Sequence, residues 1–270
     1  MTTKFYIVDT FSKDAFHGSP TAVFLVDDLS NEELLQNMAI EINTPESIFI
    51  KELQHGDFEI VCFCQSTKGM FFGNGLFAAA EVIYRKQNKL TTFNFICGNK
   101  IYQVDHQDNK EIKIKFSTLT LNKVSMPSSL TSALDGELVV SIAECKNDLI
   151  VEIRSPKRVF NLIPNMDILK GIDYNLIILT ADTHYETEVD YDFCAKVFAP
   201  KLGIFNDIIS PFAHVKLAAY WVDRMEKNEF IGHQASEFRT GYSKVSYGEE
   251  FTYISGNCII SATGEMNSKV

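Results

Sequence analysis

The sequence has little positive charge and lacks the common signatures of nucleic-acid binding. Its 25 Lys and Arg residues stand against 35 Asp and Glu residues, which gives a formal net charge of −10. There is no basic run, no zinc-finger spacing and no aromatic pair of the kind found in RNA-binding sheets. Because nucleic acids are bound mainly through cationic contacts to phosphate, we expect no nucleic-acid partner.

Long apolar runs are missing as well. No stretch approaches the roughly 18 consecutive apolar residues of a membrane-spanning helix. The segment MTTKFYIVDTF at residues 1–11 enters a strand pattern without an apolar leader. We therefore expect a cytoplasmic protein with no membrane partner.

Nothing in the sequence predicts a metal or a nucleotide cofactor. Cys62 and Cys64 form a C-x-C pair, but no further closely spaced ligands follow it. The six cysteines are scattered over strand-like segments, which is typical of reduced core cysteines in a cytoplasmic protein. The glycines of FGNGLF (72–77) are too few for a dinucleotide-binding loop. We expect six free thiols, no metal and no cofactor.

The sequence does contain enough apolar residues for a packed core. Hydrophobic residues make up 46% of its 270 residues, and this length suits one large domain or two modest ones. Strand-like segments outnumber helical ones and occur in runs, which predicts an α+β protein with antiparallel or mixed sheets. The predicted strands include 4–10, 22–26, 47–53, 58–64, 92–97, 101–106, 111–116, 138–142, 149–153, 175–181 and 252–261.

Four segments carry helical patterns. Segment 30–42 begins with Ser30 and Glu33, which predicts a capping box at its start. Segments 75–87 and 212–225 are apolar nearly all round, as in buried helices. A shorter candidate covers residues 166–171.

The two buried helices belong to a weak internal repeat. Segments 62–84 and 197–221 share a strand-end Phe, a polar stretch, a Gly, a turn and a small-residue-rich apolar helix. This repeat predicts two similar halves, each a curved sheet around a central helix. The Ser/Thr/Pro-rich segment 117–132 is the natural linker. We predict one half at 1–118, to which the last strand 258–266 returns, and another at 119–257.

Glu46 lies in INTPESIFI (42–50), between turn residues and an apolar strand. Taken alone, such a residue is more commonly a solvated loop end than a functional group. Several longer segments favour a functional role for Glu46 instead, because of the family they resemble. These are FSKDAFHGSPTAVFLVDD (11–28), MAIEINTPESIFI (38–50), GNGLFAAAEVIY (73–84), APKLGIFNDIISPFAHVKLAAYW (199–221) and GHQASEF (232–238).

Together these segments resemble the PhzF-like family of phenazine-biosynthesis isomerases, in the right order and over almost the whole chain. The resemblance implies a diaminopimelate-epimerase-like fold with two pseudo-symmetric halves and an active cleft between them. It also implies a homodimer and proton transfer without a cofactor.

The family pattern N-x-x-E-T/S falls on NTPES and implies that Glu46 is the general acid/base. Desolvation at an apolar strand mouth is expected to raise its pKa toward the working pH. A second family position falls on Asp207, which is expected to bind substrate or to orient the exchanged proton. The alternative is that Asp207 caps the following helix.

Other positions are assigned to substrate binding. Gly73, Asn74 and Gly75 look like the carboxylate-binding turn of the cysteine-dependent epimerases that share this fold. Those enzymes carry a thiolate directly before the turn, where this sequence has Phe72, so a two-thiol racemase is excluded. Gln234 and Ser236 are expected to line or brace the site.

This sequence also departs from the family pattern. Asn74 stands where C-G-H-A-T has its His. Pro211 and Phe212 replace the Gly-Ser pair of D-P-V-T-G-S-A-H, so Phe212 is expected to favour an apolar or flat part of the ligand. His214 is interpreted as a core residue. The resemblance implies an isomerase acting on a small carboxylate-bearing substrate, and the alternative is a catalytically degenerate member that binds small molecules or proteins.

Overall fold

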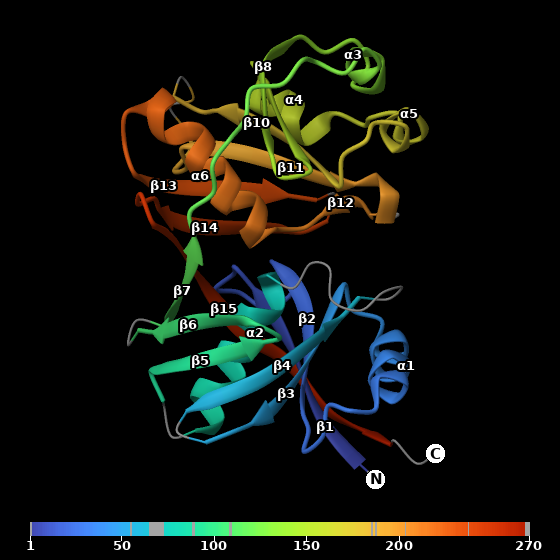
Figure 1. The fold of residues 1–270 in the computed structure, drawn as a ribbon, viewed down its shortest axis with the longest axis vertical. Coiled ribbons are helices and arrows are strands. Elements are labelled where there is room, and N and C mark those ends of the chain that lie inside the picture. The colour runs from blue at the N-terminus through green and yellow to red at the C-terminus, as the bar shows by residue number, and fades with distance from the viewer. Residues whose placement is uncertain are drawn as a thin grey trace. The chain divides into compact units, whose positions relative to one another are not determined.

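The computed structural model describes residues 2–54, 56–64, 73–87, 90–107, 110–184, 186, 188–202, 204–236 and 238–267. Phe72 lies outside these ranges. The chain forms two compact units (Figure 1). Unit 1 comprises Met1–Phe116 and Ser255–Val270, and unit 2 comprises Ser117–Ile254. The sequence-based division into one half at 1–118 with strand 258–266 and another at 119–257 stays a prediction.

Unit 1 is a closed barrel. Seven of its strands pair in chain order, and β15 pairs with both β7 and β1. The strands are β1 (Thr2–Thr10), β2 (Ser19–Leu25), β3 (Glu46–Glu52), β4 (Asp57–Phe63), β5 (Thr92–Cys97), β6 (Lys100–His106), β7 (Glu111–Ser117) and β15 (Phe251–Asn267). Closure leaves no free sheet edge among these strands.

Unit 2 repeats much of this arrangement. Its strands are β8 (Val139–Cys145), β9 (Asp148–Ile153), β10 (Leu176–Asp182), β11 (Phe193–Ala199), β12 (Ile204–Asp207), β13 (Glu229–Ala235) and β14 (Thr240–Ser246). They pair in the order β8-β9-β10-β11-β13-β14, and β12 adds to β11. The helical elements outside its core helix are α3 (Leu130–Ala133), α4 (Pro156–Asn161), α5 (Met166–Lys170) and η1 (Pro200–Leu202).

The two units share one pattern of strand direction. Along β1 to β6, the pairings alternate between antiparallel and parallel, beginning and ending antiparallel. The series β8-β9-β10-β11-β13-β14 alternates in the same way. Each parallel pair requires a crossover, which α1 (Glu32–Ile42), α2 (Gly73–Lys86), α4 with α5, and α6 (Pro211–Met225) supply. The predicted α+β fold with two like halves is confirmed.

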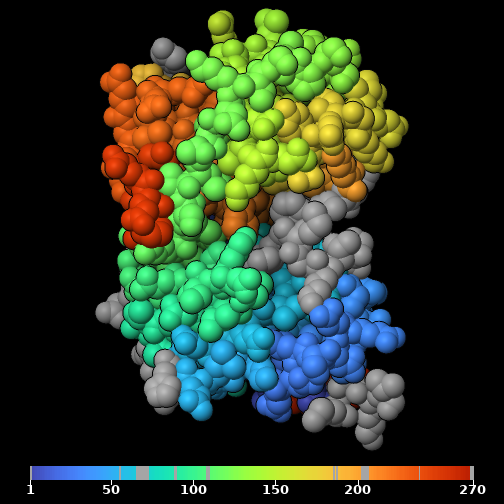
Figure 2. All heavy atoms as spheres, in the orientation of Figure 1, coloured from blue at the N-terminus to red at the C-terminus, as the bar shows by residue number. Residues whose placement is uncertain are grey.

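Helices α2 and α6 form the centres of the two units, as predicted. Every residue of α2 from Gly73 to Ile83 is buried, and the helix packs against β1, β2, β3 and β6. On the face drawn in Figure 2, green atoms of β5 and β6 cover the region where Figure 1 shows α2. Most of α6 is buried as well, including Trp221.

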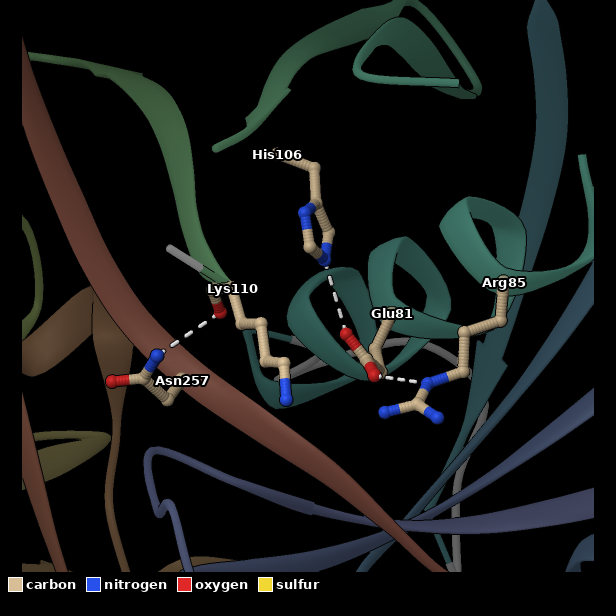
Figure 3. A network of polar contacts seen from close by, with 5 residues as sticks. All are labelled: Glu81, Arg85, His106, Lys110 and Asn257. Atoms are coloured by element: carbon tan, nitrogen blue, oxygen red, sulfur yellow. Dashed lines mark hydrogen bonds and ion pairs between the residues drawn. The ribbon is translucent and has the colours of Figure 1, made fainter. Parts of the chain in front are cut away.

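A polar network fixes α2 inside the barrel (Figure 3). Oε2 of Glu81 lies 3.0 Å from Nε2 of His106 on β6, and its other carboxylate oxygen bonds Arg85. The His106 ring stacks on Tyr84 with 3.6 Å between ring centroids. Glu81 and Asn74 are two helical turns apart and therefore lie on the same face of α2. The network thus helps to set the direction in which Asn74 points.

The predicted capping box at the start of α1 is wrong. The helix begins at Glu32, and its N-cap is Asn31, whose side chain accepts a hydrogen bond from Leu34 N–H. The Ser30 hydroxyl instead donates to the Asp28 carboxylate across 2.6 Å. The helix therefore starts one residue later than predicted, with Asn31 instead of Ser30 as its N-cap. The predicted helix at 166–171 is confirmed as α5, with Asn165 as its cap.

The sequence also gave expectations about the cysteines, metal sites and membrane-spanning helices. All six cysteines are free thiols, as expected. Cys62, Cys145, Cys194 and Cys258 are buried, whereas Cys64 and Cys97 are only half-buried, so these two are not core residues as the sequence predicted. Burial raises the pKa of Cys194 to about 12 and that of Cys258 well above its usual value, so both thiols stay protonated.

Within the described ranges, no group of His, Cys, Asp and Glu could hold a metal ion. No helix in the part of the chain described above has the length and apolarity to cross a membrane.

Candidate active site

Glu46 is the first residue of β3 and is buried. Helix α1 ends at Ile42, and its C-cap Asn43 adopts the left-handed conformation (φ 56°), which turns the chain toward the sheet. The Thr44 hydroxyl then donates to the Glu46 carbonyl across 2.8 Å. Only 8% of the Glu46 surface is exposed, so Glu46 is not a solvated loop end.

The Glu46 carboxylate lies at the N-terminus of α2. Gly75 N–H donates to Oε2 across 2.8 Å, and Nδ2 of Asn74 lies 3.5 Å from Oε1. N–H groups in the first helical turn have no partner within the helix and favour a negative charge. They stabilise the ionised form of Glu46, whereas burial disfavours it. The sequence-based interpretation considered only burial.

Gly75 allows the helix start to approach β3 closely. A Cβ at this position would lie 3.2 Å from Cδ1 of Ile48 and 3.5 Å from Oε2 of Glu46. The sequence predicts that Gly73, Asn74 and Gly75 bind a substrate carboxylate. The structure brings this turn to a carboxylate, but it is the protein's own Glu46. The substrate-binding role of the turn stays a prediction.

Asn74 is held from its other side by Thr10, which sequence analysis did not single out. Thr10 ends β1, is fully buried, and has Oγ1 3.1 Å from Oδ1 of Asn74. The same hydroxyl lies 3.2 Å from the carbonyl oxygen of Ser19. No local pattern marks Thr10, because its contact with Asn74 joins residues 64 positions apart.

Asp207 of unit 2 ends β12 and is half-buried. Burial of its carboxyl group raises its pKa to about 7, although a hydrogen bond from the backbone of Ile208 lowers the pKa by a smaller amount. The N-cap of α6 is Ser210, whose hydroxyl accepts from Ala213 N–H across 3.3 Å. The alternative that Asp207 caps this helix is therefore wrong.

Gln234 ties together the segment that leads into α6. Its Nε2 donates to the Asp207 carbonyl across 3.0 Å, and its Oε1 accepts from Ser210 N–H across 3.1 Å. The Ser236 hydroxyl bonds the backbone of Arg239 and closes the turn between β13 and β14. Phe212 is the second residue of α6 and is half-buried.

His214 is a core residue, as predicted. It is fully buried, and its Nδ1 bonds the Ser243 hydroxyl. Burial lowers its pKa to about 3, and the pKa of His233 falls to about 4 for the same reason. Both imidazoles are neutral near pH 7.

The chain resembles known proteins over almost its full length. A family model described as phenazine biosynthesis-like protein matches residues 8–264. An uncharacterised isomerase of Halalkalibacterium halodurans is 27% identical over 269 residues, which cover 98% of this chain and 99% of that protein. The crystal structure of a PhzF-family protein from Enterococcus faecalis superposes with a TM-score of 0.89 at 24% identity, covering 99% and 100% of the two chains. A hydroxyproline epimerase of Agrobacterium vitis shares the fold at a TM-score of 0.64 and 9% identity, over 98% and 92% of the two chains.

Proposed function

The chain belongs to the family of phenazine biosynthesis-like proteins, and on that premise we propose that it is a cofactor-independent isomerase that moves a proton within a small carboxylate-bearing substrate. The isomerase class rests on the family and on full-length relatives that are named isomerases. Glu46 would be the general acid/base. The observation that supports this role is its buried carboxylate at the start of α2.

Such a carboxylate meets the chemical requirements of proton transfer. It is shielded from bulk water, and in its ionised form it accepts from Gly75 N–H at one oxygen and from Asn74 at the other. A fixed acid/base group commonly accelerates proton transfer by ~10²–10⁴. The proposed reaction only moves a proton, so its atoms balance without a further reactant.

Asp207 is proposed as a second acid/base group. Its pKa of about 7 lets it hold or release a proton near neutral pH. Gly73, Asn74, Gly75, Phe212, Gln234 and Ser236 are proposed to contact or position the substrate. A homodimer and a cytoplasmic location, both inferred from sequence, remain part of the proposal.

The test is deuterium incorporation in heavy water. The protein is incubated with a panel of small cyclic and amino carboxylates, and incorporation is followed by mass spectrometry. Glu46→Gln is expected to lower the rate at least 100-fold, since it removes the acid/base group. Glu52→Gln is the matched control, because Glu52 lies at the exposed far end of the same strand. It should exchange at the wild-type rate.

Two other outcomes have clear meanings. If Glu46→Gln exchanges as fast as the wild-type protein, Glu46 is not the acid/base. If the wild-type protein is stabilised by a carboxylate in a thermal-shift assay but exchanges none, it is a binding protein that has lost catalysis.

A further inference from the structure

Thr10 has more acceptors than its hydroxyl can serve at once. Its Oγ1 lies 3.1 Å from Oδ1 of Asn74 and 3.2 Å from the Ser19 carbonyl oxygen. A hydroxyl group carries a single proton but can also accept hydrogen bonds. Thr10, Ser19 and Asn74 are each at most 2% exposed, so water does not readily replace a missing partner.

With Glu46 ionised, only one orientation of the Asn74 amide fits. The atom of Asn74 that faces Oε1 of Glu46 is 3.5 Å away, and a carbonyl there would oppose a carboxylate. The NH₂ group must therefore face Glu46, and Oδ1 must face Thr10. Two oxygens 3.1 Å apart need a proton between them, so Thr10 donates to Asn74 in this state.

With Glu46 protonated, the opposite orientation fits. Gly75 N–H needs an acceptor at Oε2, so the added proton resides on Oε1, which faces Asn74. A protonated Oε1 donates and requires the carbonyl of Asn74 in front of it. The NH₂ group then faces Thr10 and donates to Oγ1, and the Thr10 proton turns to the Ser19 carbonyl.

We propose that Thr10 and Asn74 form a hydrogen-bond switch that reverses when Glu46 takes up or loses its proton. In both states, Thr10 Oγ1, both ends of the Asn74 amide and Oε1 of Glu46 each have a partner. Neither protonation state then leaves a buried polar group unpaired, which would cost stability. Thr10 is thus a positioning residue that acts on Glu46 through Asn74.

The switch gains its purpose from the proposed acid/base role of Glu46, but it is a property of the protein without substrate. The direct test is therefore Glu46→Gln at constant pH. Because Gly75 N–H requires an oxygen, the amide nitrogen of the introduced glutamine must take the place of Oε1 and donate to Asn74. This neutral variant should hold Asn74 in the reversed orientation.

The readout is the NMR cross-relaxation between the Asn74 side-chain amide protons and the Thr10 γ-methyl group. At pH 8, we expect this signal to be at least twofold stronger in Glu46→Gln than in the wild-type protein. Equal intensities in the two proteins would overturn the proposal. If the variant does not fold, the wild-type protein is compared above and below the titration midpoint of the Glu46 carboxyl carbon, and the same increase is expected on the acid side.

Thr10→Val removes the hydroxyl while keeping the side-chain shape. It should lower the melting temperature by roughly 2–4 °C in both the wild-type and the Glu46→Gln backgrounds, because the hydroxyl is used in both states. The matched control is Thr21→Val. Thr21 is equally buried and pairs with Glu46 across β2 and β3, but its hydroxyl has no hydrogen-bond partner among the described residues. It should lower the melting temperature in neither background.

If Thr10→Val lowers the melting temperature in only one background, the Thr10 hydroxyl does not form hydrogen bonds in both states, and this contradicts the switch.

The experiments can overturn the switch and the proposed function independently of each other. If Asn74 reverses but no substrate exchanges deuterium, the inference stands and the proposed function falls. If deuterium exchanges but Asn74 does not reverse, the function stands and the inference falls.

Discussion

The backbone N–H of Gly75 donates a hydrogen bond across 2.8 Å to Oε2 of Glu46, a residue 29 positions earlier in the chain. Glu46 thus caps the start of α2 from a neighbouring strand, in the way that an N-cap side chain does from the adjacent loop. The residue proposed for catalysis therefore also stabilises the central helix of unit 1.

We predict that Glu46→Ala lowers the free energy of unfolding by about 1–2 kcal/mol, the usual cost of losing a cap. Glu46→Gln should cost less, because its amide oxygen still accepts from Gly75. Urea denaturation followed by circular dichroism measures both. An alanine variant as stable as the wild-type protein would show that the contact does not support the helix.

Asp207 is expected to destabilise the protein at high pH. Its folded pKa of about 7 exceeds the unfolded value of 3.8, so the folded state holds the proton more tightly and stability falls as pH rises from about 4 to 7. Asp207→Asn removes this cost and should stabilise the protein by roughly 2–4 kcal/mol at pH 8. Thermal melts at pH 4 and pH 8 should show the gain only at pH 8.

His214 is expected to act in the opposite direction. Its folded pKa of about 3 lies below the ordinary value of 6.5, so the unfolded chain takes up a proton first and stability falls as pH drops below 6.5. The loss approaches ~1.4 kcal/mol per pH unit. In His214→Asn, unfolding free energies measured from pH 7 to pH 4 should fall less steeply by about this amount. An unchanged slope would mean that His214 is already charged in the folded protein.

The contact between His106 and Glu81 should contribute to the stability of unit 1. His106→Phe keeps a ring to stack on Tyr84 but leaves the buried Glu81 carboxylate without one donor. We expect a loss of about 1–3 kcal/mol. His106→Gln can still donate and should lose less. Equal losses in the two variants would assign the effect to ring packing instead of the hydrogen bond.

Pro211 and Phe212 should restrict the choice of substrate. Pro211 offers no N–H at the start of α6. Phe212 places a ring where the resemblance implies a small Ser. We therefore predict weak or no turnover of a hydroxylated dihydroanthranilate, the substrate that the resemblance to the phenazine-biosynthesis isomerases implies. Pro211→Gly with Phe212→Ser should widen the range of polar carboxylates that exchange deuterium. Efficient turnover of that compound by the unmodified protein would contradict the prediction.

The fold class and the two central helices could be predicted from the amino-acid sequence. Helices α2 and α6 carry apolar residues on nearly every side, and such a segment is stable only when other elements surround it. The strand segments are rich in alternating apolar residues, which local periodicity reveals. Both signals are contained within short windows, so they can be read without knowing which strands pair.

Local patterns were less reliable at the ends of elements. Ser30 and Asn31 are neighbours and both good capping residues, so the sequence pattern placed the helix start one residue too early. The motif around Glu46 marked a candidate, but neither its burial nor its position at the start of α2 follows from residues 42–50 alone.

The contacts that hold Glu46 depend on the assembled barrel and could not be predicted from the sequence. Strand β2 pairs with both β1 and β3, and α2 packs against all three strands. This places the last residue of β1 and the first residue of β3 beside the first turn of α2 and brings Thr10, Asn74 and Glu46 into contact. These contacts span 64 and 28 positions along the chain. A hydroxyl, an amide and a carboxylate have no preferred spacing in sequence, so their alignment depends on strand order and on the rotation of one buried helix.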